Sequence, residues 1–158
     1  NKTIGANASS SPIYKYENTF TTAASGEHSI SDLEFDQYEI NNTNGFDLAS
    51  ACPGAPLSLQ AGVDTRLEQE LVANASHTLR VIVVDGLGRS LPGASVNLTR
   101  SGYDETNLTN TCGQAFFTGG LTSNSDYEVV VSLAGYSDET NSAVDVSGDS
   151  QLIVTLTN

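Results

Sequence analysis

The stretch that decides the fold is HTLRVIVVDGLGRSLPGASVNLTRSGYDETNLTNTCGQAFFTGGL, residues 77–121. Leu79, Val81 and Val83 alternate with other side chains, and a second alternating run at 94–98 follows the Gly/Pro-rich loop DGLGRSLPG. Period-two alternation between turn residues is typical of β-strands. The stretch predicts the opening half of a small β-sandwich.

Further short strands are predicted after it, each bounded by Gly, Asn, Asp or Ser. Their sequences are NL (107–108), GQAFF (113–117), DYEVVVSL (126–133), SAVDVS (142–147) and QLIVTL (151–156). Seven short strands about ten residues apart are typical of an antiparallel sandwich.

The second half of this pattern occurs a second time, in the first part of the chain. TTAASGEHSISDLEFDQYEINNTNGFDL (21–48) aligns with the segment from Thr109, and LSLQAGVDTRLEQELV (57–72) aligns with 143–157. The second alignment favours a strand over a helix for TRLEQELVA. The first copy has no equivalent of 79–100, and only residues 13–20 upstream alternate like a strand.

We therefore predict an all-β chain of two tandem Ig-like or transthyretin-like antiparallel β-sandwich domains. Residues 1–74 would form an incomplete domain, with a polar leader and without its opening strands, and residues 75–158 a complete one.

The motifs VVDGLGRSLPGASVNLT, GQAFFTGGL and YEVVVSLAGYSD resemble the carboxypeptidase regulatory-like and CnaB-like family of β-sandwiches. The positions that carry the resemblance are Pro92-Gly93-Ala94-Ser95-Val96, Gly113, Phe117, Tyr127 and Gly135-Tyr136. The paired arrangement is also similar to C-terminal regions of surface proteins with pilin-like leaders. The resemblance implies a non-enzymatic spacer, stalk or fibre subunit. Some relatives form a Lys–Asn isopeptide bond, but residues 75–158 contain no lysine.

Composition excludes some classes of partner. Nineteen acidic and six basic residues give a net charge of −13, and such a surface repels nucleic acid and anionic membranes. The longest apolar runs, VIVV and VVV, are too short to span a bilayer, so we expect no membrane insertion in this segment.

Six N-x-Ser/Thr sequons favour an extracellular or cell-surface glycoprotein that carries covalent glycans. They are at Asn1, Asn7, Asn41, Asn74, Asn97 and Asn107. Cys52 and Cys112 are the only cysteines, and in an oxidising compartment they would form one disulfide, which would join the two predicted domains. The alternative is two buried free thiols.

The sequence shows no organised nucleophile, metal or cofactor site, so we expect no enzyme activity and no cofactor. The segment DLEFDQYE would place Asp32, Glu34 and Asp36 on one face of a strand. Paired carboxylates could serve glycoside hydrolysis, and an oxygen cluster could bind Ca²⁺. A solvated strand face explains the alternation more simply.

An incomplete sandwich leaves an open edge that can pair with another chain. Three explanations for the missing strands stay open: an excerpted sequence, completion by residues 1–16, or a strand from a neighbouring copy. The last predicts a homopolymer, a pilus-like extracellular filament joined by donor strand complementation. The alternative is an adhesin or carbohydrate-binding module, with Tyr14 and Tyr16 as contact residues.

The predicted subunit interface has two parts. Outward-facing apolar positions would form a covered surface, and QLIVTLTN would be the better donor strand on its pattern. The residues are Ile82, Val84, Val130, Leu152, Ile153, Val154 and Leu156.

Overall fold

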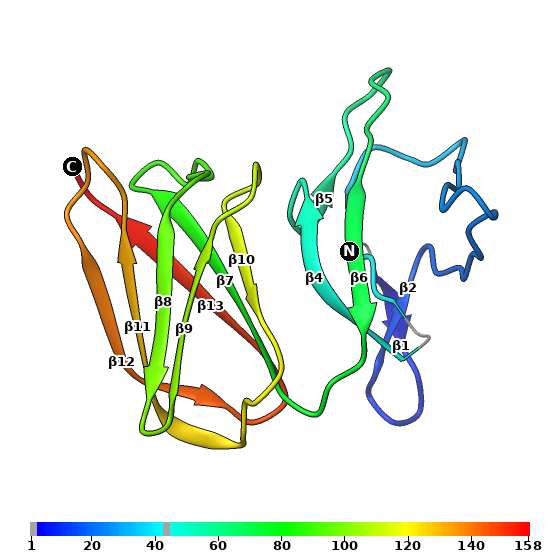
Figure 1. Ribbon diagram of the computed structural model, residues 1–158. Helices are drawn as coiled ribbons and strands as arrows, with labels where there is room; N and C mark the ends of the chain where they lie inside the picture. The colour runs from blue at the N-terminus through cyan, green and yellow to red at the C-terminus, as the bar shows by residue number, and fades with distance from the viewer. Residues whose placement is uncertain (1–2, 43–44) are drawn as a thin grey trace. The chain divides into compact units, whose positions relative to one another are not determined.

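The computed structural model describes residues 3–42 and 45–158, and every regular element in that part of the chain is a β-strand (Figure 1). The predicted all-β fold class is confirmed. The chain divides into two compact units. We call Asn1–Asn41 with Ala55–Arg66 the N-terminal unit, and Asn42–Gly54 with Leu67–Asn158 the sandwich unit.

One sheet of the sandwich unit has four strands in the order β12-β11-β8-β9, all antiparallel to their neighbours (Figure 1). Their residues alternate between buried and more exposed positions, as expected for strands with one face on a core. The strands are β8 (Ser95–Arg100), β9 (Tyr103–Leu108), β11 (Asn124–Ser132) and β12 (Glu139–Val146).

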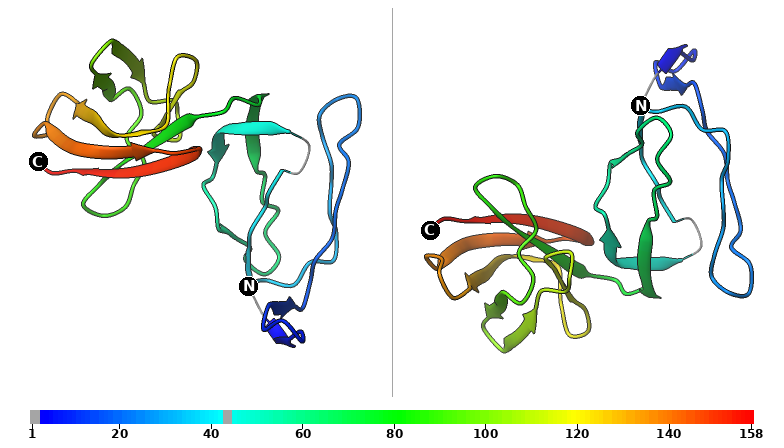
Figure 2. Two further views of the ribbon diagram at one scale, coloured as in Figure 1. Left: turned by 90° about the horizontal axis from the view of Figure 1, so that it is seen from below. Right: turned by 90° about the horizontal axis from the view of Figure 1, so that it is seen from above.

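The other sheet has three strands in the order β10-β7-β13. They are β7 (Thr78–Asp85), β10 (Gln114–Phe117) and β13 (Asp149–Leu156). β13 runs parallel to β7, so the prediction of a purely antiparallel sandwich is wrong at this pair. The chain reverses at residues 147–148 between β12 in one sheet and β13 in the other, which brings β13 beside β7 in the same direction. Both views of Figure 2 show β12 (orange) alongside β13 (red), and the two strands are in contact.

The core lies between these two sheets and is made by inward positions of their strands, with Tyr103 of β9 packed against it. Its largest fully buried side chains are Tyr127, Phe117, Leu79, Leu98 and Leu156. The alternation seen in residues 77–121 therefore predicted the core positions of β7, β8 and β10.

A hairpin of β4 (Phe46–Cys52) and β6 (Glu68–Ala73) belongs to the sandwich unit. The strand predicted for TRLEQELVA is therefore confirmed at β6. One face of β4 is buried, at Asp47, Ala49 and Ala51, and β4 contacts both β7 and β10. The two compact units therefore do not follow the predicted domain boundary between residues 74 and 75.

The two segments aligned by the sequence repeat pair differently. β6 pairs antiparallel with β4, whereas β13, its counterpart in the repeat, pairs in parallel with β7. The similarity between these segments therefore reflects strand pattern rather than a shared topology.

The N-terminal unit consists of short pairs. β1 (Thr3–Ala6) pairs with β2 (Pro12–Tyr14), and β3 (Gln37–Tyr38) pairs with β5 (Leu57–Ser58). The strand predicted over residues 13–20 extends only to Tyr14. The strand predicted through DLEFDQYE is limited to Gln37–Tyr38, since the chain bends at residues 35 and 36 and Asp32 has a left-handed backbone (φ 60°).

Candidate functional site

The candidate site is the outer edge of β13. β13 has eight residues and pairs with β7 without a register shift, from Asp149 opposite Thr78 to Leu156 opposite Asp85. It has no second neighbour within its sheet. Residues 150–156, SQLIVTL, contain no charge and no proline. A long, regular and uncharged edge strand offers its backbone groups for pairing with another chain.

Two of the other three edges carry features that hinder such pairing. β9 has acidic residues at Asp104 and Glu105. β12 has acidic residues at Glu139 and Asp145, two register shifts against β11, and a left-handed residue at Ala143 (φ 59°). Charges and irregular backbone on an edge are common protections against strand addition.

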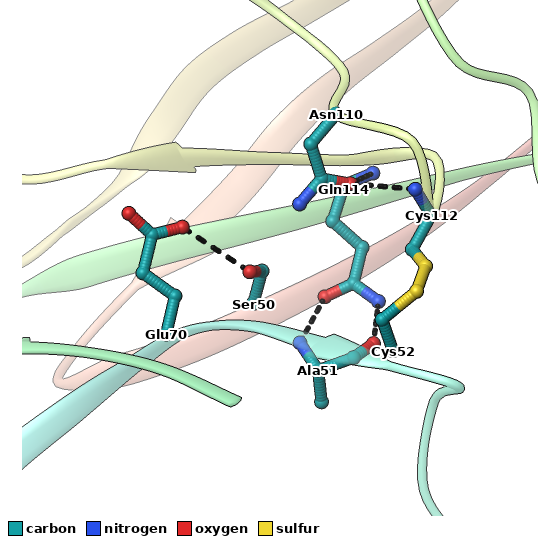
Figure 3. Close-up of a disulfide and its surroundings, with 7 residues drawn as sticks. All are labelled: Ser50, Ala51, Cys52, Glu70, Asn110, Cys112 and Gln114. Carbon is teal, nitrogen blue, oxygen red and sulfur yellow. Dashed lines mark hydrogen bonds between the residues drawn. A yellow bond between two sulfur atoms is a disulfide. The ribbon is translucent and has the colours of Figure 1, made fainter. Parts of the chain in front are cut away.

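The third edge, at β10, is closed by the β4–β6 hairpin (Figure 3). A disulfide joins Cys52 at the end of β4 to Cys112 before β10, with 5.7 Å between their Cα atoms. Beside it, the Ala51 N–H donates to Gln114 Oε1 (3.0 Å), and Gln114 Nε2 donates to the Ala51 carbonyl (2.6 Å). The predicted disulfide is confirmed, and both of its cysteines lie in the sandwich unit.

The outer face of the three-stranded sheet is apolar near β13. Ile153 lies opposite Ile82 in register, and Thr155 lies opposite Val84. Ile153 is 59% exposed, whereas Ile82 and Val84 are half-buried. At the next row, Arg80 Nη2 donates to Gln151 Oε1 (2.5 Å), so polar side chains border the apolar row on that side.

The predicted interface is only partly a surface. Val154 and Leu156 are buried in the core of their own sandwich, and their role in a subunit interface stays a prediction. Leu152 is half-buried and packs against the same core. Val130 lies on β11 of the other sheet, opposite Asn97 and Thr140, and does not continue the row of Ile82.

The six sequons differ in their surroundings. Asn7, Asn41 and Asn74 are exposed, and Asn1 lies outside the described residues. Asn97 and Asn107 are half-buried, and their Nδ2 atoms, to which a glycan would be attached, donate hydrogen bonds. Asn97 donates to Asp104 and Thr106 (both 2.9 Å), and Asn107 to Glu105 (2.9 Å) and to the Phe116 carbonyl (3.0 Å).

Two of the predicted acidic residues have contacts with other parts of the N-terminal unit. Glu34 forms an ion pair with Lys15 at 2.6 Å, and the Asp36 carbonyl accepts the Leu59 N–H. In the described residues, no group of three or more His, Cys, Asp or Glu side chains is placed to bind a metal ion. No helix in that part of the chain is long and apolar enough to cross a membrane.

Sequence reasoning missed the role of Gln114. It lies on the outward phase of β10 and is nevertheless buried, because it pairs with the backbone of β4. A glutamine in a short strand carries no sequence signal for such a contact. The neighbouring Asn110 is different, because asparagine is common in turns. Its Oδ1 accepts the N–H groups of Cys112 and Gln114.

It also missed Asp85, which organises the loop after β7. Its carboxylate accepts the N–H groups of Arg89 and Leu87 (both 2.9 Å) and pairs with the Arg89 guanidinium at 2.7 Å. The hydrogen bond from the Arg89 N–H, with smaller effects from its side chain and from Leu87, holds the pKa of Asp85 below its usual value.

The chain was compared with known proteins. No protein-family model and no curated protein sequence matches it. Among solved structures, similar chains include the Bacillus anthracis TIE protein, at 18% identity and a TM-score of 0.43. The match covers 59% of this chain and 20% of that one. The resemblance to carboxypeptidase regulatory-like and CnaB-like domains stays a prediction from sequence.

Proposed function

We propose that this chain is a structural subunit of a glycosylated, pilus-like extracellular filament, whose copies join by β-strand pairing. The observation that supports the proposal most strongly is the β13 edge, which is regular and uncharged while the other edges of the sandwich are charged, irregular or covered. Strand addition at such an edge supplies main-chain hydrogen bonds from end to end of the new strand.

The location is supported by the disulfide and by the exposed sequons. Disulfides form and persist in oxidising compartments, including the cell exterior. Asn7 and Asn74 are exposed, and the Asn7 Oδ1 accepts the N–H groups of Ser9 and Ser11, which fixes this side chain in a surface turn. We expect glycans at these two sites in preference to Asn97 and Asn107.

A filament requires that the two joined surfaces differ. A contact between identical patches closes into a dimer, whereas a head-to-tail contact repeats without limit unless it closes into a ring. The β13 edge would be one of the two surfaces. In this arrangement the core positions of β13 stay in their own sandwich, and only its outer edge and the exposed Ile153 meet the neighbour.

The test is assembly of the purified chain with its disulfide intact. Sedimentation velocity over a hundredfold range of concentration, with electron microscopy of the same samples, should show growing species and filaments with a regular subunit repeat. A chain that stays monomeric across the whole range, and shows only dispersed particles, would contradict the proposal.

A second candidate is an adhesin or carbohydrate-binding module. Tyr14 and Tyr16 are 43% and 42% exposed, and the Tyr16 ring packs edge-on against Tyr38 with 6.0 Å between ring centroids. Exposed aromatic rings are suitable platforms for sugars. A glycan array with the Tyr14→Ala/Tyr16→Ala double variant tests this role, and binding that survives both substitutions removes its support.

A further inference from the structure

We propose that the β1–β2 hairpin of one copy pairs with the β13 edge of a second copy. This inference rests on the proposed function, and it identifies the two surfaces that would meet. The acceptor is the outer edge of β13, and the donor is the β1 strand of the hairpin, Thr3–Ala6.

The donor hairpin is exposed in its own chain. Every residue of β1 and β2 is exposed, including Ile4 at 70% and Ile13 at 43%. A two-stranded hairpin without a core to pack on is only marginally stable in water, and a third strand stabilises it. β1 has a register shift against β2 between Thr3 and Gly5, but because Pro12 in β2 lacks an N–H, β1 is still the strand better suited to form a new ladder.

Charge favours this hairpin over the rest of the chain as the donor. Residues 1–16 contain both lysines and no acidic residue, a formal charge of +2, and Lys15 is paired with Glu34 of the same chain. Residues 17–158 contain four arginines and all nineteen acidic residues, a formal charge of −15. The N-terminal segment that contains the hairpin is therefore the part of one copy that another copy's acidic body repels least, and favourable charge assists encounter and register.

The acceptor edge has the matching arrangement. Its uncharged run 150–156 carries Ile153, which is exposed, and acidic residues flank it. Asp149 begins the strand, and Asp138 follows Ser137, whose N–H donates to the Thr157 carbonyl (2.8 Å) just after β13. β13, which is apolar with acidic residues near its ends, is therefore complementary in polarity to β1, a short apolar strand next to a lysine in the sequence.

A symmetric contact, β13 against β13, is the main competitor for the same edge. It would place the acidic residues at the ends of two β13 strands close to one another, between two copies that each carry −13. Like charges across an interface oppose association. The donor hairpin avoids this repulsion and also gives the two different surfaces that a filament needs.

Two variants of the full-length, disulfide-intact chain test the pairing. Ile153→Lys places a cation on the acceptor, and Ile4→Asp places an acid on the donor. Each position is exposed, so we expect the fold to be kept. We expect each substitution alone to raise the concentration needed for assembly by at least about tenfold. Thr140→Lys on β12 and Thr19→Asp outside the hairpin are matched controls, and both should assemble like the unsubstituted chain.

Mixing the two variants separates the possible contacts. Each variant alone lacks one half of the joint, whereas in the mixture the unsubstituted donor of one variant meets the unsubstituted acceptor of the other. The aspartate introduced at position 4 also meets the lysine introduced at position 153 with opposite charge, so the mixture should assemble at lower concentration than either variant alone. If Ile4→Asp alone still dimerises while Ile153→Lys does not, β13 pairs with β13 and the inference is overturned. If both variants assemble like the unsubstituted chain, the filament proposal stands and this joint is wrong. If the unsubstituted chain never assembles, the filament proposal falls and the inference with it.

Discussion

The three-stranded sheet has two edge strands, β10 and β13, and they differ in whether their outer backbone groups are covered. β10 has four residues, and its edge is closed by a disulfide and by the pairing of Gln114 with Ala51. β13 has eight residues in unbroken register, and its edge carries neither charge nor irregularity over 150–156. Since open edges invite pairing, β13 is the edge of this sheet at which another strand could add.

The largest effect should come from opening the covered edge. Replacing Cys52 and Cys112 together by serine removes a cross-link between residues 60 apart and should lower the free energy of unfolding by about 4 kcal/mol. Urea denaturation measures it. Assembly through β13 should persist wherever the variant is folded, and loss of assembly in a folded variant would show that the two edges are not independent.

The next largest effect is expected from substitutions on the buried face of β13, compared with its exposed face. Leu156→Ala removes a fully buried side chain and should cost about 3 kcal/mol of stability, within the range for buried leucines. Ile153→Ala, on the exposed face of the same strand, should cost less than about 1 kcal/mol. Thermal denaturation of both variants provides the comparison, and equal losses would contradict the placement of β13.

A smaller effect isolates the amide contact at the covered edge. Gln114→Ala leaves the Ala51 N–H and carbonyl without their partner and should cost about 2 kcal/mol. The matched control is Gln151→Ala on β13, where the lost hydrogen bond to Arg80 is exposed, and the change should stay within about 0.5 kcal/mol. A Gln114 variant as stable as this control would mean that the disulfide alone holds the hairpin.

The smallest effect concerns Asp85 at the end of β7. Because the folded state lowers its pKa, its stabilising effect is present above the unfolded pKa and is lost as pH falls through the folded value. Asp85→Asn should therefore be less stable than the unsubstituted chain at pH 7, and the two should converge at low pH. Urea titrations from pH 7 to pH 2 check this, and a constant difference would rule out the carboxylate as its cause.

The sequence predicted the sandwich well where alternation was strong and local. Val81, Val96 and Val129 are all fully buried, as their positions in alternating runs implied. At Val154 and Leu156 the same pattern left two interpretations, since an apolar alternation fits a strand in its own core as well as a donated strand. In this chain β13 pairs with β7, 71 residues away in register, a contact between distant segments that alternation alone does not specify.

The first part of the chain was harder to predict because its structure depends on contacts that leave little trace in the sequence. β4 buries one face made of Asp47, Ala49 and Ala51, which are small or polar residues without a hydrophobic pattern. The Asp47 carboxylate accepts the Ala75 N–H (2.7 Å), and this contact helps to group β4 with the sandwich. Repeat alignment could not reveal such contacts, since it compares patterns and not partners.

The most direct test of the account is hydrogen–deuterium exchange at the two edges, before and after assembly. The account predicts that amides of 149–156 become more slowly exchanging in the assembled chain, because they gain hydrogen bonds to a new strand, while those of 114–117 do not change. Unchanged exchange at 149–156, with new protection elsewhere, would contradict the claim that β13 is the open edge at which copies join.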